Sequence, residues 1–199
     1  MRKVIVANII SLDGRFAGPG GDVMAMPFAS GFSEYNAARL RAADTLLLGR
    51  TTFEGFRDYW PPVADDEDAP ELEREISRLN GAIDKVVVSD SLTADQTGAM
   101  AATTRIVRRA DAHDAVRALR QGGGRDILVF GSHILWNDLL VHGLVDELHL
   151  LVGPGVVGDG VPAFEGRPAV SLGLLEARTL GDGGLVLLRY AVGAERASD

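Results

Sequence analysis

Two short segments of the chain combine an apolar run, a glycine and hydroxyl side chains. They are Leu46–Phe53 and Leu128–Ile134. In each, the apolar residues predict a buried strand, and the polar residues after the glycine predict the start of a helix. A glycine lets a ligand approach the backbone, while a helix start offers unpaired N–H groups and a positive dipole end. Both segments therefore suit the binding of phosphate groups.

The side chains in these turns strengthen this hypothesis. Thr51, Thr52 and Ser132 add hydroxyl donors, and the guanidinium of Arg50 can grip a terminal phosphate with two hydrogen bonds. One such turn is also compatible with an ordinary capped helix. Arg50 is also compatible with a role in a surface salt bridge. Two turns in one chain favour a ligand that carries two or three phosphates.

A third glycine-rich segment, Gly153–Gly158, matches the dinucleotide pattern G-x-G-x-x-G after an apolar run. That pattern binds a dinucleotide only where it opens a helix within a βαβ unit. Here Asp159-Gly160-Val161-Pro162 follows, which is typical of a turn. The sequence therefore argues against a Rossmann domain and predicts a loop near the ligand.

The connection after the first apolar run, Ser11–Asp22, is long and rich in glycine. Its length favours a functional loop, although a mobile surface loop fits equally well. The histidines show no metal-ligand spacing, so we expect no metal site. His149 lies in an apolar run and is expected to be structural, whereas His133 follows one of the phosphate turns.

The composition of the 199 residues excludes several classes of function. The chain has 28 acidic and 20 basic residues, a net charge of -8 that disfavours nucleic acid as a partner. It has no cysteine, which excludes disulfides, thiolate zinc sites and cysteine nucleophiles. No apolar stretch reaches the roughly 18 residues of a membrane helix, and the short apolar start favours a strand over a signal peptide. We expect no membrane partner and a cytoplasmic location.

Apolar runs and helical periodicity alternate along the front half of the chain. Five runs predict strands that are covered on both faces, as in a parallel sheet; they are residues 3–10, 45–48, 85–88, 104–107 and 126–130. Apolar spacings of three and four predict helices between them; they are residues 33–43, 72–83, 112–119 and 132–141. Residues 61–70, an acidic segment bounded by prolines, predict a surface loop.

The end of the chain has a different pattern. Residues 145–152, 169–180 and 184–192 predict strands that only loops connect, with a hairpin turn at Leu180–Leu185. An α/β fold with one mixed sheet and an antiparallel C-terminal edge follows from this order. We predict a single domain over residues 1–192 and a disordered tail at 193–199.

Six segments then indicate a resemblance that covers nearly the whole chain. They are Ser11–Gly14, Leu48–Phe53, Val86–Ser89, Phe130–Ser132, Leu144–Leu148 and Gly153–Gly160. With these residues the chain resembles the dihydrofolate-reductase superfamily. It is most similar to stand-alone proteins like the reductase domain of bifunctional riboflavin-biosynthesis deaminase–reductases. Each segment is moderately specific, and together they point to the fold rather than to a substrate.

The resemblance implies a dihydrofolate-reductase-like three-layer fold with about eight mostly parallel strands, and NADPH as hydride donor. It implies that the backbone at Ala7 contacts the nicotinamide end and that the loop around Asp13 and Gly14 borders nicotinamide and substrate. Arg50 would face the adenosine 2′-phosphate, and Ser89 would lie near the adenosine. The implied phosphate-binding residues are Gly49, Arg50, Thr51, Thr52, Gly131, Ser132, His133 and Ile134.

The chain also departs from these relatives. Dihydrofolate reductases carry a carboxylate at the start of the first helix, and Glu34 lies near that position in a poorly matching segment, which disfavours folate as substrate. The bifunctional riboflavin enzymes also carry a zinc deaminase with the motifs H-x-E and P-C-x-x-C. This chain has no cysteine, so we do not expect it to perform that deamination.

The expected reaction is hydride transfer to a C=N or C=O bond of a small heterocyclic substrate, pterin-like or pyrimidine-like. Asp13, Glu34 and bound water are the candidate proton sources. Asp13 also fits a turn residue, and Glu34 also fits a carboxylate that faces a helix dipole.

Three alternatives stay open from the sequence. One is a true 5-amino-6-ribosylamino-pyrimidine phosphate reductase of riboflavin biosynthesis. Another is a protein that binds NADP(H) or another nucleotide without turnover. The third is a structural homodimer whose cleft is vestigial. The apolar late strands would supply its interface, although these strands fit a core equally well.

Overall fold

The computed structural model describes residues 1–193, so the predicted tail lies outside the described residues except for Gly193. Eight strands form a mixed sheet in the order β5-β4-β3-β6-β1-β7-β10-β9, and β2 and β8 form a separate antiparallel pair. The pairs β1–β7, β3–β4, β3–β6 and β4–β5 are parallel, whereas β10 runs antiparallel to β7 and to β9. The predicted α/β class with an antiparallel C-terminal edge is confirmed.

The contacts divide the chain into two compact units, and the predicted single domain stays a prediction. Unit 1 comprises Met1–Val4 and Ser33–Leu135, and unit 2 comprises Ile5–Phe32 and the chain from Trp136 onward.

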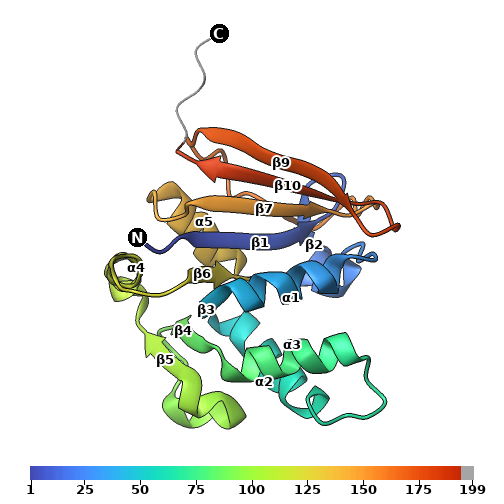
Figure 1. The fold of residues 1–199 in the computed structure, drawn as a ribbon. Coiled ribbons are helices and arrows are strands. Elements are labelled where there is room, and N and C mark those ends of the chain that lie inside the picture. Colours follow the sequence, from blue (N-terminus) through green and yellow to red (C-terminus); the bar gives the residue numbers. More distant parts are fainter. Residues whose placement is uncertain (194–199) are drawn as a thin grey trace. The chain divides into compact units, whose positions relative to one another are not determined.

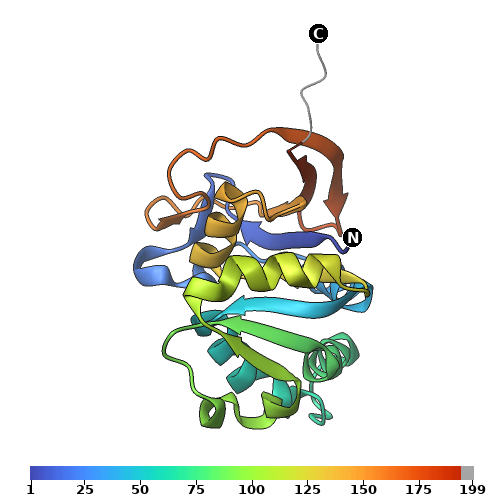
Figure 2. The same cartoon turned by 90° about the vertical axis from the view of Figure 1, so that its left-hand side faces the viewer.

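Unit 1 is a parallel sheet with helices. Its strands are β3 (Ala43–Gly49), β4 (Asp84–Val88), β5 (Thr104–Val107) and β6 (Asp126–Val129). Its helices are α1 (Phe32–Ala42, whose first residue is in unit 2), α2 (Arg50–Val63), α3 (Glu71–Ala82) and α4 (Ala112–Gln121), with 3₁₀ segments at Ala94–Thr103 and Arg109–Asp111. Figure 2 shows β3, β4 and β5 side by side. The apolar runs form the core because both faces of these strands are covered; Leu46, Leu47, Leu48 and Val87 are fully buried.

Helix α2 corrects the loop predicted at residues 61–70, because it continues through Pro61 and Pro62 to Val63. Both prolines lie in the last turn, where each removes one N–H bond to the carbonyl four residues before it, and the helix ends at Val63, directly after them. The hydroxyl of Ser77 donates to the carbonyl of Trp60 at 2.6 Å and ties this end to α3. Helices α2 and α3 pack against each other, as Figure 1 shows.

Unit 2 contains the rest of the sheet. Its strands are β1 (Val4–Ile10), β7 (Glu147–Val152), β9 (Leu172–Leu180) and β10 (Leu185–Val192), with the short pair β2 (Arg15–Ala17) and β8 (Val161–Pro162). Helix α5 (His133–Val141) begins in unit 1, and 3₁₀ turns lie at Pro19–Gly21 and Val23–Ala25. The predicted hairpin between β9 and β10 is confirmed. Its turn is held by Ser30, whose hydroxyl donates to Asp182 Oδ1 at 2.6 Å.

Three charged or titratable side chains are embedded among the leucines of β7 and β10. His149 is fully buried and Glu147 nearly so. Glu147 Oε2 lies 2.8 Å from His149 Nε2 and accepts a 3.0 Å bond from Arg189. Arg189 also binds Glu176 of β9 at 2.9 Å. His149 therefore belongs to a buried polar network, in line with the structural role predicted for it.

Within the described part of the chain, no helix is both long and apolar enough to cross a membrane.

Candidate functional site

The two predicted phosphate turns meet at one edge of unit 1. Strand β3 ends at Gly49, and Gly131 follows the end of β6, its parallel neighbour in the sheet. The amide of Gly49 donates to Ser132 Oγ at 2.9 Å, and the amide of Ser132 donates to Thr52 Oγ1 at 2.8 Å. The starts of α2 and α5 are therefore hydrogen-bonded to each other, which sequence spacing alone did not show.

The second turn has an unusual backbone. Gly131 and Ser132 both have positive φ, 53° and 51°, and Ser132 is the only non-glycine residue with positive φ among residues 1–193. A Cβ added to Gly131 would lie 2.8 Å from Thr52 Oγ1 and 2.9 Å from its methyl group. Position 131 therefore suits glycine in conformation and in space. Ser132 is a non-glycine residue with positive φ, and strained residues of this kind are concentrated at functional sites.

Both helix starts are favourable to an anion. Neither α2 nor α5 has an acidic residue in its first turn, and the N-cap Gly49 provides no side-chain capping bond. The first N–H groups of α2 therefore lack the usual carboxylate or hydroxyl partner at the N-cap. Thr51 and Ile134 are exposed beside these starts, and His133 is half-buried.

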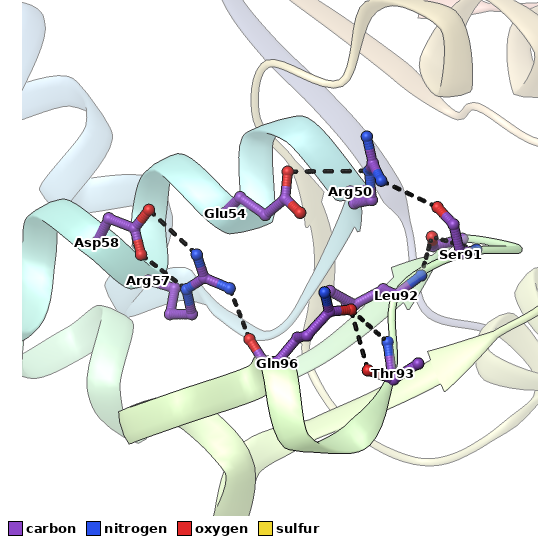
Figure 3. A network of polar contacts seen from close by, with 9 residues as sticks. Arg50, Glu54, Arg57, Asp58, Ser91, Leu92, Thr93 and Gln96 are labelled. Atoms are coloured by element: carbon purple, nitrogen blue, oxygen red, sulfur yellow. Dashed lines mark hydrogen bonds and ion pairs between the residues drawn. The ribbon is translucent and has the colours of Figure 1, made fainter.

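Arg50 connects the first turn to the loop after β4. Its Nη1 donates to Ser91 Oγ at 3.0 Å, and its Nε lies 3.8 Å from Glu54, one helical turn further along α2 (Figure 3). The side chain is 50% exposed, which leaves the guanidinium accessible to a ligand. The predicted alternative, a surface salt bridge, is present in this weak form and does not preclude anion binding.

Ser89 stabilises the loop after β4. It is 3% exposed, and its hydroxyl accepts bonds from the amides of Ser91 at 3.2 Å and Leu92 at 2.9 Å. Ser89 thus holds Ser91 in the position that Arg50 contacts.

Two further arginines lie at the same loop and were missed by the sequence analysis. Arg108 donates to the carbonyl of Asp90 at 2.5 Å, and the backbone amide of Arg109 donates to Asp90 Oδ1 at 2.9 Å. The signal was present, because both residues directly follow β5, and the carboxyl ends of parallel strands share one edge.

The remaining predicted cofactor residues lie in unit 2. Ala7 is buried in the middle of β1, opposite His149 of β7. Gly14 has a φ of 75°, and its amide donates to the carbonyl of Ser11 at 2.9 Å, so this residue closes a tight turn.

Asp13 is engaged in binding a neighbouring loop. It accepts bonds from Ser11 Oγ at 2.6 Å, from the amide of Val157 at 3.0 Å and from that of Gly158 at 2.8 Å. The Ser11 hydroxyl and then these amides lower the pKa of Asp13 from 3.8 to about 2. Asp13 is thus ionised at neutral pH, which favours the structural alternative over a role as proton donor. Gly153–Gly158 forms this loop and opens no helix, in agreement with the argument against a Rossmann domain.

The other candidate proton source, Glu34, lies in the first turn of α1. A carboxylate there faces the positive end of the helix dipole, so its position also fits the structural alternative.

Comparison with known proteins identifies the family of this chain. The model of the RibD C-terminal domain matches residues 2–186. The chain belongs to the RibD C-terminal domain family. The uncharacterized protein YyaP of Bacillus subtilis is 29% identical over 185 residues, which cover 92% of this chain and 91% of that protein.

Two solved structures share the fold of this RibD C-terminal domain protein. A putative riboflavin biosynthesis protein from Shewanella sp. PV-4 has a TM-score of 0.66 and 20% identity, covering 96% of this chain and 99% of that one. Dihydrofolate reductase from Enterococcus faecalis, complexed with NADP(H), has a TM-score of 0.57 and 12% identity, covering 96% and 94%. The predicted resemblance and the dihydrofolate-reductase-like fold are confirmed. The family supports a reductase-like, oxidoreductase function.

Proposed function

We propose that this protein is an NADPH-dependent reductase that transfers hydride to a C=N or C=O bond of a small heterocyclic substrate. The observation that carries the proposal is the pair of hydrogen-bonded glycine turns, with two helix starts that hold no acidic residue. This arrangement fits a pyrophosphate, because it combines two helix dipoles with a start of α2 that has no capping side chain and no acidic residue.

The proposed cofactor residues are those that the resemblance implies, with Ser91, Arg108 and Arg109 added. The residues that the resemblance implies are Ala7, Gly14, Gly49, Arg50, Thr51, Thr52, Ser89, Gly131, Ser132, His133 and Ile134. Arg50 would hold the 2′-phosphate together with Ser91, because its exposed guanidinium and the Ser91 hydroxyl already adjoin. Ser89 would act indirectly, by holding the Ser91 loop.

NADPH, when bound, supplies the hydride, and the protein supplies position and charge. The residues of this chain bind the phosphates and hold the loops in place. We propose Glu34 or bound water as the source of the proton, and Asp13 as a positioning residue, since its carboxylate is ionised and bound to Val157 and Gly158.

Calorimetric titration of the purified protein with NADPH and with NADH tests the cofactor. We expect saturable binding of both with a clear preference for NADPH. If neither binds, the reductase proposal is wrong, although the fold stands. Binding without oxidation across a panel of pterins, aminopyrimidines and carbonyl compounds would instead favour the nucleotide-binding alternative.

A second copy of the chain is the proposed partner. Strand β9 is an edge strand of the sheet, and its Leu172, Leu174 and Leu175 are 40–59% exposed. A long edge strand with exposed leucines pairs readily with another chain. We therefore propose a homodimer through β9.

A further inference from the structure

A pocket of about 400 Å³ lies at the amino ends of the parallel strands of unit 1. It is lined by Thr45, near the start of β3, and by Asp84, the first residue of β4. Thr45 precedes Gly49 by four residues, which is roughly 13 Å along a strand. The two phosphate turns lie at the carboxyl ends of the same sheet, so this pocket is distinct from the proposed phosphate site.

Two arginines line the pocket, and both have guanidinium N–H groups without an acceptor. Arg105 is exposed on the edge strand β5, and within residues 1–193 no hydrogen bond or ion pair engages its side chain. The side chain of Arg2 is only 7% exposed. Its Nε donates to the carbonyl of Arg125 at 2.8 Å, and its Nη2 donates to Asp44 and to Thr45 Oγ1. Nη1 has no acceptor among the described residues, although it belongs to a buried arginine that lines the pocket.

The strand register brings these groups to one face of the sheet. Val86 of β4 pairs with Arg105 of β5, and Asp84 of β4 pairs with Thr45 of β3. Asp84 and Val86 are two positions apart, so the paired side chains project from the same face. Arg2 donates to Thr45 on that face, so both guanidinium groups reach the pocket from the same side of the sheet.

A third cation, Lys85, is buried at this pocket without a carboxylate partner. It lines the pocket and is 1% exposed. Its Nζ donates to two neutral oxygens, the carbonyl of Ile83 at 2.7 Å and Thr103 Oγ1 at 2.9 Å. Within the described chain no ion pair includes Lys85, and burial lowers its pKa from 10.5 to about 8, against a smaller opposing effect of Asp84. Because buried lysines in proteins are normally paired, this one indicates a missing negative charge.

The pocket has an excess of positive charge in an acidic protein. Its lining contains three cations and one carboxylate, Asp84, a net charge of +2 that Asp44, the partner of Arg2, reduces to +1. The whole chain has a net charge of -8. A concave site lined by one sign of charge concentrates ligands of the opposite sign. Asp84 makes no hydrogen bond or ion pair in the described part of the chain, so it can accept a hydrogen bond from the same ligand.

We propose that this pocket binds a small metabolite through an oxyanion, a phosphate or carboxylate group, with Arg2, Lys85 and Arg105 as its cationic residues. The oxyanion accepts hydrogen bonds from Arg2 Nη1 and from Arg105, and its charge offsets the burial of Lys85. A hydroxyl or amino group on the ligand donates to Asp84. The pocket volume lies in the range of about 300–1,000 Å³ that is typical of ligand sites. The site does not depend on the proposed reductase activity.

NMR titration of the ¹⁵N-labelled full chain with inorganic phosphate, and separately with acetate, tests the site. Sodium chloride keeps the ionic strength constant, and a pH of about 6.5 keeps Lys85 charged. We expect saturable shifts of the amides of residues 103–105 with at least one anion, and the tighter anion identifies the group. The amides of Gly49–Thr52 report separately on phosphate at the turns. Absence of saturable shifts at residues 103–105 with both anions overturns the proposal.

Variants of exposed residues locate the bound anion. Arg105→Gln should weaken its binding at least about tenfold, because a charge-assisted hydrogen bond is lost. Asp84→Asn should strengthen it, because a like charge is removed. The matched control is Arg78→Gln, since Arg78 is a half-exposed arginine of α3 that pairs with Glu71, and this variant should bind the anion like the wild type. Equal weakening in Arg105→Gln and Arg78→Gln, or weaker binding in Asp84→Asn, overturns the assignment.

Discussion

At the scale of single residues, the phosphate turns depend on a few atoms that only the folded chain brings together. Ser132 lies 80 positions from Thr52, yet its amide reaches the Thr52 hydroxyl. Arg50 reaches Ser91 across 41 positions. The residue types could be selected from the sequence because glycine, hydroxyl and arginine side chains suit phosphate. Their partners could not, because those pairings depend on the order of strands in the sheet.

Arg50→Ala should weaken NADPH much more than NADH. Loss of a charge-assisted hydrogen bond of roughly 1.5–3 kcal/mol corresponds to about a tenfold to hundredfold loss of affinity. Calorimetric titration of each variant with both cofactors measures this. Arg41→Ala is the control, because Arg41 is also a half-exposed arginine of unit 1, and its guanidinium pairs with Glu75. Equal weakening of NADPH and NADH would rule out a 2′-phosphate contact.

Gly131→Ala should lower both stability and NADPH affinity. The positive φ alone costs a residue with a Cβ about 1–2 kcal/mol, and the approach to Thr52 adds to it. Gly143→Ala is the matched control, since Gly143 has a φ of 66° and nothing within 4 Å of an added Cβ. Urea unfolding of both variants isolates the effect of the close approach. If the two lose equal stability and both keep NADPH affinity, the turn does not need that approach.

At the scale of elements, the apolar runs predicted the long strands well. The run Thr104–Val107 coincides with β5, and the other predicted strands overlap those observed. Short elements were missed: β2 and β8 have three and two residues, too few for a pattern to emerge. The end of α2 was misplaced because Pro61 and Pro62 are read as helix breakers, whereas the helix includes both and ends at Val63, directly after them.

The loop clasp made by Asp13 should depend on pH. Its folded pKa of about 2 lies below the usual 3.8, so the clasp stabilises the loop above about pH 4 and is lost as the pH falls through 2. Hydrogen exchange at the amides of Val157 and Gly158, corrected for intrinsic rates, should show protection that decreases over this range. Asp13→Asn should remove the pH dependence, and Asp22→Asn should not. Protection in Asp13→Asn that follows the wild type would contradict the clasp.

At the scale of the whole molecule, the sequence supported a fold and a cofactor class more readily than a substrate. Glycine turns and buried strands have local signatures, and these predicted Gly49, Gly131 and their surroundings. Exposed apolar side chains have none, because Leu12, Phe28 and Val156 look like ordinary core residues in the sequence until the fold exposes them.

The proposed homodimer is also a property of the whole molecule. Leu174→Glu should convert a dimer into a monomer, because it puts a charge on the exposed edge strand β9. Light scattering after size exclusion measures the mass of wild type and variant. Val141→Glu, on an exposed position elsewhere, should leave the mass unchanged. A wild-type protein that stays monomeric at high concentration contradicts the proposal.

The network of Glu147, His149 and Arg189, in which the first two side chains are buried and Arg189 is 31% exposed, also disfavours misregistered pairing in the sheet. A shift of β10 by one residue would turn Arg189 to the opposite face, because side chains alternate along a strand. Glu147 would then be buried without its cation, a state that costs several kcal/mol, on the order of 3–5. Leucines alone would tolerate such a slip far better, since Leu187 and Leu188 are interchangeable in shape. A few charges among apolar residues thus select one alignment of strands during folding.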